Sequence, residues 1–282
     1  MKANILTAIQ NIVNSPIGEL KTFYESRNRA NNMGIALETY IQDVFAGTLF
    51  EENEEKRLLE LEKAFSYLGN QNNPPDVIIR DGDAIEVKKI ESDASQLALN
   101  SSYPKAKLYA DNPMITAKCR SCEKWSEKDI IYAVGVVNKS NLTRLFFVYG
   151  IDYAASASTY ERIKTKISEG INAIRNVEFA DTKELARVNR VDPLGITYLR
   201  IRGMWGIDNP TRVFSKVLKS KSTAKFNFTA IINSAKYDSF PAAQRSKLES
   251  MINKSFSIDD IKIKTPDNPS ILKDAKLITH SR

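Results

Sequence analysis

The sequence PPDVIIRDGDAIEVKK, residues 74–89, contains two short apolar runs on either side of a glycine-containing turn. Apolar runs that flank such a turn predict a β-hairpin. Because side chains alternate along a strand, Glu86 and Lys88 should share one face while Ile85 and Val87 occupy the other. The hairpin therefore places charged side chains directly beside apolar ones. These charges form either a solvated strand face or part of a metal site.

The direction in which Asp76 points depends on the length of the turn. A two-residue loop would pair Asp76 with Val87, on the wrong face for a shared site. A three-residue loop over residues 80–82, with Gly82 in the left-handed position of a bulge, pairs Asp76 directly with Glu86. The two Cβ atoms would then be about 5 Å apart, so both carboxylates could bind one cation. The longer loop favours a metal site, although spacing alone leaves a charged, solvated hairpin an equal alternative.

Phosphodiester hydrolysis would use this combination of residues. Mg²⁺ is a hard cation that proteins hold with one or two carboxylates, together with water and phosphate oxygens. It lowers the pKa of a bound water and neutralises charge that develops on the phosphate. A lysine on the same face can orient that water and stabilise the transition state. Asp76 and Glu86 are therefore candidate Mg²⁺ ligands, and Lys88 is the candidate catalytic cation.

The bulk composition is that of a folded, soluble protein. The chain has 282 residues, of which 42% are hydrophobic and 27% are charged. The net charge of +7 favours a polyanionic partner, although many basic proteins have none. Residues 1–13 predict an amphipathic helix rather than a signal peptide, and no run is long enough for a membrane span. The sequence predicts a cytoplasmic protein without a membrane partner.

Two residue types restrict the possible chemistry. The single histidine, His280, lies almost at the C-terminus, which disfavours catalytic triads and nucleases that activate water with histidine. Cys119 and Cys122 form a CxxC pair, but a zinc site would need two further ligands. We interpret them as ordinary reduced cysteines. The sequence also lacks a glycine-rich phosphate loop, so any catalysis must depend on carboxylates, lysines and a metal.

The order of the expected elements indicates one mixed α/β domain over residues 1–282. Residues 1–70 are expected to be helical, with helices over about 34–45 and 52–68. The continuously apolar run 130–137 is typical of a strand buried on both faces. The other expectations are a core over about 71–180, a helix that begins at Ser158 with Glu161 as capping partner, strands within 195–203 and 225–232, and an elaborated C-terminal part over about 181–282.

The hairpin resembles the motif of a nuclease superfamily. Pro75-Asp76, nine residues and then Glu86-Val87-Lys88 are similar to the PD-(D/E)xK pattern, in which the acidic residues bind Mg²⁺ and the lysine assists the water. The resemblance implies a restriction-endonuclease-like core, a mixed β-sheet flanked by helices. This superfamily often adds an acidic residue from a preceding helix. Glu38 resembles that metal ligand, and its equal alternative is a residue at the edge of an amphipathic helix.

The resemblance extends over most of the chain. Residues 27–34, 97–108, 128–137 and 202–210, together with Trp125, are similar to Type II restriction endonucleases of the NgoPII kind. That family implies a nuclease core and a C-terminal DNA-recognition part. It also implies a short palindromic substrate of the GGCC type, which cannot be worked out from the residues themselves.

Two regions are candidates for contact with double-stranded DNA, because they combine basic side chains with hydrogen-bonding ones. Residues 100–107 follow the catalytic strand closely, and residues 199–225 contain seven basic residues and one acidic residue. A solvated strand edge is the alternative, and for Trp205 a place in the core is favoured. The candidate DNA-binding residues are Asn100, Ser101, Ser102, Tyr103, Lys105, Lys107, Arg200, Arg202, Trp205, Asn209 and Arg212.

The sequence therefore predicts a Mg²⁺-dependent, sequence-specific DNA endonuclease. A homodimer would match a palindrome and bring one active site to each strand, and a cognate DNA methyltransferase would protect the host. A repair or recombination nuclease that recognises DNA structure is an alternative on the same core. A non-catalytic DNA-binding protein is another, although such a protein has no need for opposed carboxylates.

Overall fold

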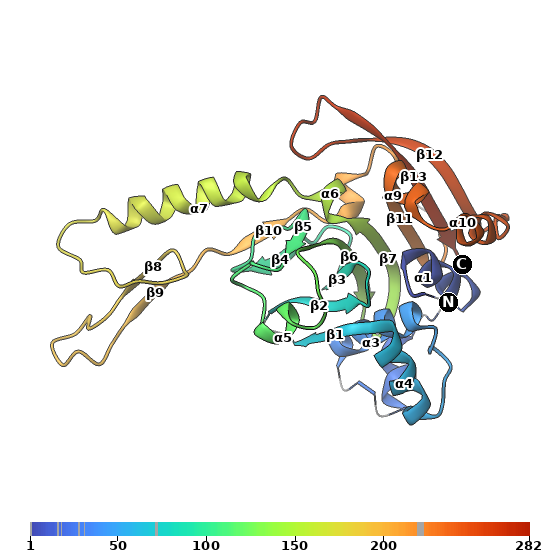
Figure 1. Ribbon diagram of the computed structural model, residues 1–282, viewed down its shortest axis with the longest axis horizontal. Coiled ribbons are helices and arrows are strands. Elements are labelled where there is room, and N and C mark those ends of the chain that lie inside the picture. Colours follow the sequence, from blue (N-terminus) through green and yellow to red (C-terminus); the bar gives the residue numbers. More distant parts are fainter. Residues whose placement is uncertain are drawn as a thin grey trace.

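A mixed β-sheet crosses the centre of the protein (Figure 1). The computed structural model describes residues 2–15, 17, 19–27, 29–30, 32–70, 73–218 and 223–282, and within these residues the sheet has nine strands. The strand order is β1-β2-β3-β6-β7-β11-β13-β12, with β5 attached to β6. The strands are β1 (Phe65–Asn70), β2 (Asn73–Ile79), β3 (Ala84–Ile90), β5 (Lys107–Tyr109), β6 (Glu127–Asn138), β7 (Asn141–Tyr149), β11 (Asn227–Asn233), β12 (Phe256–Lys264) and β13 (Leu272–Ser281).

Strand direction follows from the connections between the strands. β3 pairs with β6 in parallel, and β7 pairs with β11 in parallel, because long segments separate these strands in the sequence. Neighbours that follow each other closely in the chain, such as β2 and β3, pair antiparallel. The apolar run predicted at residues 130–137 lies in β6, and its side chains are buried on both faces of the sheet. That prediction is confirmed.

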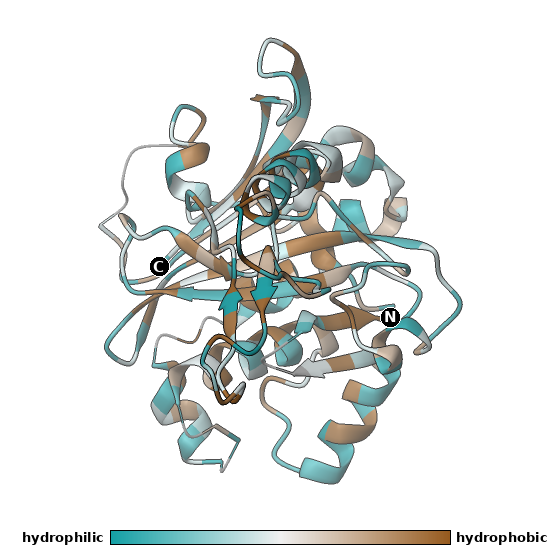
Figure 2. Ribbon diagram, turned by 90° about the vertical axis from the view of Figure 1, so that its left-hand side faces the viewer, coloured by the Kyte–Doolittle hydropathy of each residue, from teal (hydrophilic) through white to brown (hydrophobic). Residues whose placement is uncertain are grey.

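Helices and short strands cover the two faces of this sheet. The N-terminal helices pack on one face, where their apolar residues join those of β2, β3, β6 and β7 in one core cluster. The opposite face has a second core, closed by short elements. Figure 2 shows apolar residues concentrated on the strands and on the helix faces against them. The covering elements are α1 (Ile5–Asn14), α2 (Leu20–Glu25), α3 (Met33–Ala46), α4 (Glu54–Ala64), α5 (Ala117–Arg120), α6 (Gly150–Tyr153), α8 (Pro210–Val213), α9 (Ser234–Ser239), α10 (Ala242–Glu249), and the pair β4 (Leu97–Asn100) with β10 (Trp205–Ile207).

One expected helix is too long. The helix predicted over residues 52–68 ends at Ala64, and Phe65–Asn70 form the edge strand β1 instead. The register of β1 shifts between Phe65 and Tyr67, so that Phe65 is buried in the first core and Tyr67 in the second. A helix could not bury two residues this close on opposite faces of a sheet. Tertiary packing therefore overrides the helical propensity of this segment.

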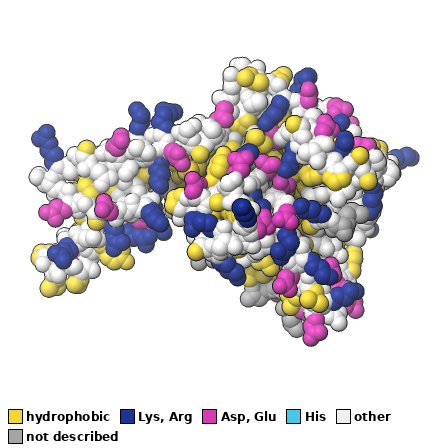
Figure 3. Space-filling view, viewed as in Figure 1, with side chains coloured by type: hydrophobic (Ala, Val, Ile, Leu, Met, Phe, Trp, Pro, Cys, Tyr) yellow, Lys and Arg dark blue, Asp and Glu magenta, His cyan; other side chains and the backbone are white. Residues whose placement is uncertain are grey.

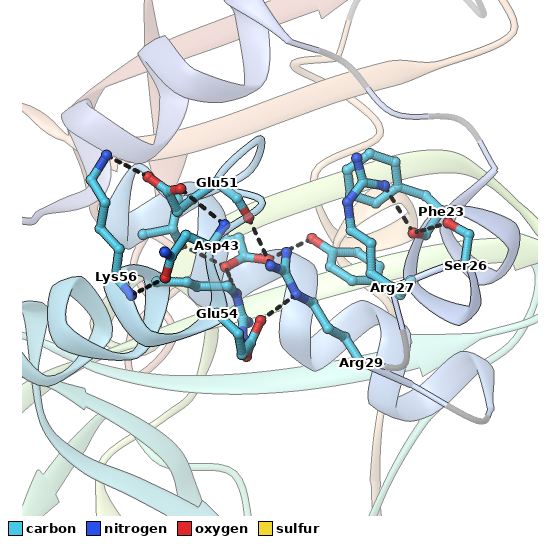
Figure 4. A network of polar contacts seen from close by, with 12 residues as sticks. Phe23, Ser26, Arg27, Arg29, Asp43, Glu51, Glu54 and Lys56 are labelled. Atoms are coloured by element: carbon cyan, nitrogen blue, oxygen red, sulfur yellow. Dashed lines mark hydrogen bonds and ion pairs between the residues drawn. The ribbon is translucent and has the colours of Figure 1, made fainter.

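A buried polar network fixes the N-terminal helices to one another (Figure 4). The Asp43 carboxylate on α3 is fully buried and accepts hydrogen bonds from Tyr24 (3.0 Å), Thr48 (2.6 Å) and the Arg57 guanidinium (2.8 Å). These partners come from α2, from the loop just after α3 and from α4. Removing one partner of a buried ion pair typically costs about 3–5 kcal/mol. The network thus holds α3, which carries Glu38, in a fixed position.

An arm projects from the body of the molecule (Figure 1). It consists of α7 (Ala157–Asn172) and the hairpin formed by β8 (Ala186–Val188) and β9 (Leu199–Ile201). The helix starts one residue before the predicted Ser158, and Glu161 does not complete a capping box because its carboxylate accepts a hydrogen bond from Tyr103. Among the described helices, none is long and apolar enough to cross a membrane.

Candidate active site

The β2–β3 hairpin has the predicted three-residue loop. Val77 pairs with Ile85 in the antiparallel ladder, so the register places Asp76 opposite Glu86 and leaves residues 80–82 as the loop. The two carboxylates are therefore on one face of the sheet, together with Lys88. The register on which the metal-site interpretation depended is confirmed.

The backbone of the loop differs from the prediction. Gly82 does not adopt the left-handed conformation; Asp81 does, with a φ of 50°. Aspartate tolerates this region better than most residues, and the Asp81 N–H donates a hydrogen bond to the Glu123 carboxylate at 3.1 Å. Gly82 instead leaves room for a neighbour, because a Cβ there would lie 3.0 Å from the Ile79 side chain, which would have to shift. The prediction for Gly82 was wrong in conformation.

The strand pair opens at the position of the carboxylates. The last ladder pair is Val77 with Ile85, and beyond it the Asp76 carboxylate accepts a hydrogen bond from the Val87 N–H at 2.6 Å. This contact replaces a backbone hydrogen bond and directs the Asp76 side chain towards β3. The pairing of β3 with β6 continues past this point. The backbone pairing of β3 thus fixes Glu86 and Lys88, whereas the hydrogen bond to its carboxylate fixes Asp76.

Glu86 has one oxygen that lacks a protein partner. One carboxylate oxygen lies 2.7 Å from the Lys88 ammonium, and the other is buried without a hydrogen bond in the described part of the chain. Burying an unpaired carboxylate oxygen is costly. A divalent cation beside Asp76 would supply the missing interaction, so the residues present fit a hard metal ion.

The protein side of such a site is small. In the described residues, no three His, Cys, Asp or Glu side chains gather closely enough to hold a metal ion. The carboxylates of Asp76 and Glu86 remain. Two carboxylates suit Mg²⁺, because this ion keeps several waters and also binds substrate phosphates. A cation of this kind would be held only weakly without a phosphate-bearing ligand.

The acidic groups influence one another strongly. Burial and the neighbouring Glu86 carboxylate raise the pKa of Asp76 to about 8. Burial also raises the pKa of Glu38, against the opposing effect of Lys88. For Lys88, burial alone would lower the pKa, but the Glu86 and Asp76 carboxylates outweigh burial and raise it. Lys88 is therefore a cation at neutral pH, and the metal-free site holds a proton on Asp76.

This proton makes the stability of the metal-free protein pH-dependent. The pKa of Asp76 is higher in the folded than in the unfolded chain, so the folded state binds more protons and loses stability as the pH rises from about 4 to 8. We expect Asp76→Asn to remove this loss. The free energy of unfolding of the variant should exceed that of the wild type by on the order of 3 kcal/mol at pH 8.5, and the two values should be nearly equal at pH 4. Denaturant unfolding of both proteins with a chelator at both pH values measures this difference. The same pH dependence of the free energy of unfolding in the wild type and the variant would contradict the assignment.

Glu38 is close to the site without being part of a compact carboxylate cluster. It lies on α3, and its carboxylate interacts electrostatically with both Lys88 and Glu86. The sequence placed it in the site only by resemblance, and the structure brings it into the electrostatic environment of the other three residues. Its role as a metal ligand stays a prediction.

Lys105 lies near the carboxylate pair, a position that the sequence did not predict. The sequence assigned it to general DNA contact, but its side chain is only 6% exposed and its ammonium donates to Ser102. Its backbone N–H donates to the Tyr132 hydroxyl at 2.7 Å, and Tyr132 is the β6 partner of Glu86. Burial lowers the pKa of Lys105 to about 8, while Glu86 opposes this shift. Lys105 is therefore a second lysine at the carboxylate pair.

The other residues of the 100–107 segment connect the site to the arm. Tyr103 stacks on Tyr160 of α7 at 5.4 Å between ring centroids and meets Trp205 edge-to-face at 6.1 Å. Trp205 is partly buried against the second core, as favoured from the sequence. Lys107 forms an ion pair with Glu127 at 2.6 Å. Asn100 is exposed next to these aromatic residues, and Ser101 lines a cleft under the arm.

The structure changes the interpretation of the second candidate region. Arg200 and Arg202 share a face, as predicted, but both form ion pairs with Glu184 at 2.6 and 2.5 Å. Arg212 is exposed and lies 3.3 Å from Asp208. The prediction that Asn209 contacts DNA is not supported, because its side chain is 2% exposed and caps α8 while donating to two backbone carbonyls. Asn209 has a structural role.

Basic side chains gather where the arm joins the body (Figure 3). There they line a cleft of about 250 Å³, with the indole of Trp205 on one side. The cleft brings together cations from α7, from the β8–β9 hairpin and from the segment between them. Its basic residues are Lys164, Lys183, Arg187, Arg200 and Arg202.

Comparison with known proteins identifies the family of this chain. The family model described as NgoPII restriction endonuclease matches residues 3–264. The chain is 54% identical over 278 residues to the Type II restriction enzyme NgoPII of Neisseria gonorrhoeae, covering 98% of this chain and 99% of that protein. The comparison with solved structures found no match. The match to the family model and the full-length similarity show that the chain belongs to the NgoPII restriction endonuclease family.

Proposed function

We propose that this protein is a Mg²⁺-dependent Type II restriction endonuclease with a PD-(D/E)xK active site formed by Asp76, Glu86 and Lys88. The observation that carries the assignment of the site is the hairpin register, which opposes the two carboxylates and leaves one buried Glu86 oxygen without a protein partner. Family membership supports the proposed cleavage of DNA, and the hairpin register supports the assignment of the catalytic residues. The substrate is double-stranded DNA with a short palindromic site of the GGCC type.

Asp76 and Glu86 would hold the metal, with Glu38 as a further candidate. When bound, Mg²⁺ supplies a water of lowered pKa and neutralises charge on the phosphate. Lys88 acts as a donor rather than as a base, because its neighbouring carboxylates raise its pKa and keep it protonated. Its ammonium orients the attacking water and stabilises negative charge in the transition state. Loss of the proton from Asp76 prepares the site for the cation.

DNA contact would extend from the site along the base of the arm. Lys105 adds a second cation beside Glu86, where a phosphate oxygen is a suitable partner for its buried ammonium. The basic cleft under the arm supplies sequence-independent phosphate contact. Asn100, Ser101 and Arg212 remain candidates for groove contacts, since they are at least partly exposed.

Two partners complete the proposal. A two-fold homodimer would present one active site to each strand of a palindrome. A DNA methyltransferase with the same specificity would protect the host genome from this activity. Neither partner is needed for the hairpin site itself to form.

Digestion of DNA tests the proposed function. We expect the purified protein to cut an unmethylated phage genome into discrete fragments with Mg²⁺, and not with EDTA. A duplex with one GGCC site should be cut once, and the same duplex with that site scrambled should stay intact. Cleavage only at branched or nicked DNA would instead indicate a structure-specific nuclease. Binding without cleavage under any divalent metal would indicate a non-catalytic DNA-binding protein.

A further inference from the structure

The helix of the arm turns a polar side towards its own hairpin. The Lys164 ammonium donates to the Lys183 carbonyl at 3.1 Å, and the Ser168 hydroxyl donates to the Leu185 carbonyl at 2.6 Å. Asn172, one turn further on, also donates to Leu185. These three polar residues recur every four positions and define one side of α7. On this side, hydrogen bonds therefore hold the helix, while at its N-terminal end Tyr160 packs on Tyr103 and Trp205.

The apolar side of α7 is left largely open. Ile163 is 39% exposed, Ile167 is 47% exposed and Ile174, just beyond the helix, is 53% exposed. No residue of α7 is buried. Contiguous exposed apolar residues on an otherwise polar element mark an interaction site. We call these three residues, together with the half-buried Ile171, the isoleucine stripe.

The spacing of the isoleucine stripe is symmetric. Ile163 and Ile171 lie four residues on either side of Ile167, so the three isoleucines are placed symmetrically about Ile167. Two copies of such a helix pack antiparallel about a two-fold axis at Ile167, because each residue then meets a partner of the same kind. We propose that α7 is the dimerisation helix of this protein and that its occupant is α7 of a second copy, antiparallel and centred on Ile167.

The charges on α7 are compatible with this pairing. In a register centred on Ile167, Lys166 lies opposite the partner's Ser168, and Lys164 lies opposite the partner's Gly170. No like charges face each other, and Gly170 has open space around its Cα. The pairing therefore brings no like charges together, and the apolar spacing is what makes the helix complementary to its own antiparallel copy.

The hairpin tip of the arm extends the same interface. With an antiparallel partner helix, the body of the second copy lies at the C-terminal end of α7. The β8–β9 hairpin projects towards that same end (Figure 1). The tip exposes Leu194 at 82% and Ile196 at 76%, and the body of the second copy would cover them. Stable dimers usually bury at least about 1,200 Å² in total. Each arm thus clasps the body of the other copy.

This inference deepens the dimer of the proposed function, but it can be tested without DNA. Sedimentation of the purified protein without DNA or metal should show a dimer, and Ile167→Asp should raise its dissociation constant at least about a hundredfold, because two carboxylates would meet on the axis. Ile252→Asp, at an exposed isoleucine outside the arm, is the matched control and should leave the dimer intact. Thermal unfolding checks that both variants fold.

Cross-linking tests the register. In a Cys122→Ser background, Ile167→Cys should form a disulfide-linked dimer on mild oxidation, whereas Ile252→Cys should not. Ile163→Cys should cross-link only when Ile171→Cys is also present. A monomeric wild-type protein, or a dimer that Ile167→Asp leaves unchanged, would overturn the proposal. If the dimer forms as expected but DNA stays uncut, the proposed nuclease function fails and the interface stands.

Discussion

Replacing Glu86 by glutamine is expected to reduce DNA cleavage at least about a thousandfold. The substitution keeps the size of the side chain but removes the charge, and with it the carboxylate oxygen that is buried without a protein partner. Metal-ion stabilisation of the transition state is worth several kcal/mol, and each 1.4 kcal/mol corresponds to a tenfold change in rate. Single-turnover cleavage of a one-site duplex at saturating protein measures the effect directly.

The control variant is Glu91→Gln, just after the same strand. Glu91 is exposed and lies 3.5 Å from Lys89, so its substitution should leave cleavage unchanged. DNA binding by Glu86→Gln, measured by fluorescence anisotropy with EDTA, should be no weaker than for the wild type. The substitution removes a negative charge that would repel a DNA phosphate, and the proposed phosphate contacts are on other residues. Cleavage by Glu86→Gln within tenfold of the wild type would remove Glu86 from the metal site.

Local rules at the hairpin were sufficient to predict its strand register. Strand alternation placed Glu86 beside Lys88, and the preference for a three-residue loop placed Asp76 opposite Glu86, as the ladder confirms. What the local rules missed was the residue that takes the left-handed conformation. Asp81 takes it because Glu123, 42 residues away in sequence, accepts its N–H. A contact of that range cannot be read from a turn sequence.

The same limit explains the errors elsewhere in the fold. Phe65 and Tyr67 read as the end of a helix, and only the two cores on opposite faces of the sheet make them a bulged strand. Asn209 was a candidate DNA contact from the sequence, but its side chain is 2% exposed, caps a short helix and donates to two backbone carbonyls of a neighbouring loop. In both cases the sequence lacked information on which surfaces become covered. The isoleucine spacing of α7, in contrast, was visible in the sequence, but its exposure was not.

Lys105 shows how residues of one site can come from separate parts of the chain. Nothing in its sequence neighbourhood distinguishes it from Lys107, two residues later. The difference arises because the Lys105 N–H binds the hydroxyl of Tyr132, which lies beside Glu86 in the sheet. Lys107 instead forms an ion pair with Glu127 at the surface. The parallel pairing of β3 with β6 is therefore what brings Lys105 to the carboxylates.

We expect Lys105→Met to reduce the cleavage rate constant by about a hundredfold to a thousandfold, with a much smaller change in DNA affinity. A preorganised donor to charge that develops in the transition state has an effect of this size. No carboxylate lies within ion-pair distance of Lys105 in the described residues, so its buried charge is available to a phosphate. Lys107→Met is the matched control and should change affinity and its salt dependence rather than the rate constant.

The pH profile separates a catalytic Lys105 from a structural one. Burial lowers the pKa of Lys105 to about 8, so the ammonium, and the rate that depends on it, should be lost as the pH rises through 8 to 9.5. Arginine stays charged over this range, so Lys105→Arg, if thermal unfolding shows that it folds, should show no decline in rate there. Lys105→Met should be slow at every pH and show no such decline. A decline in Lys105→Met equal to that of the wild type would assign the titration to another group and leave Lys105 a packing residue.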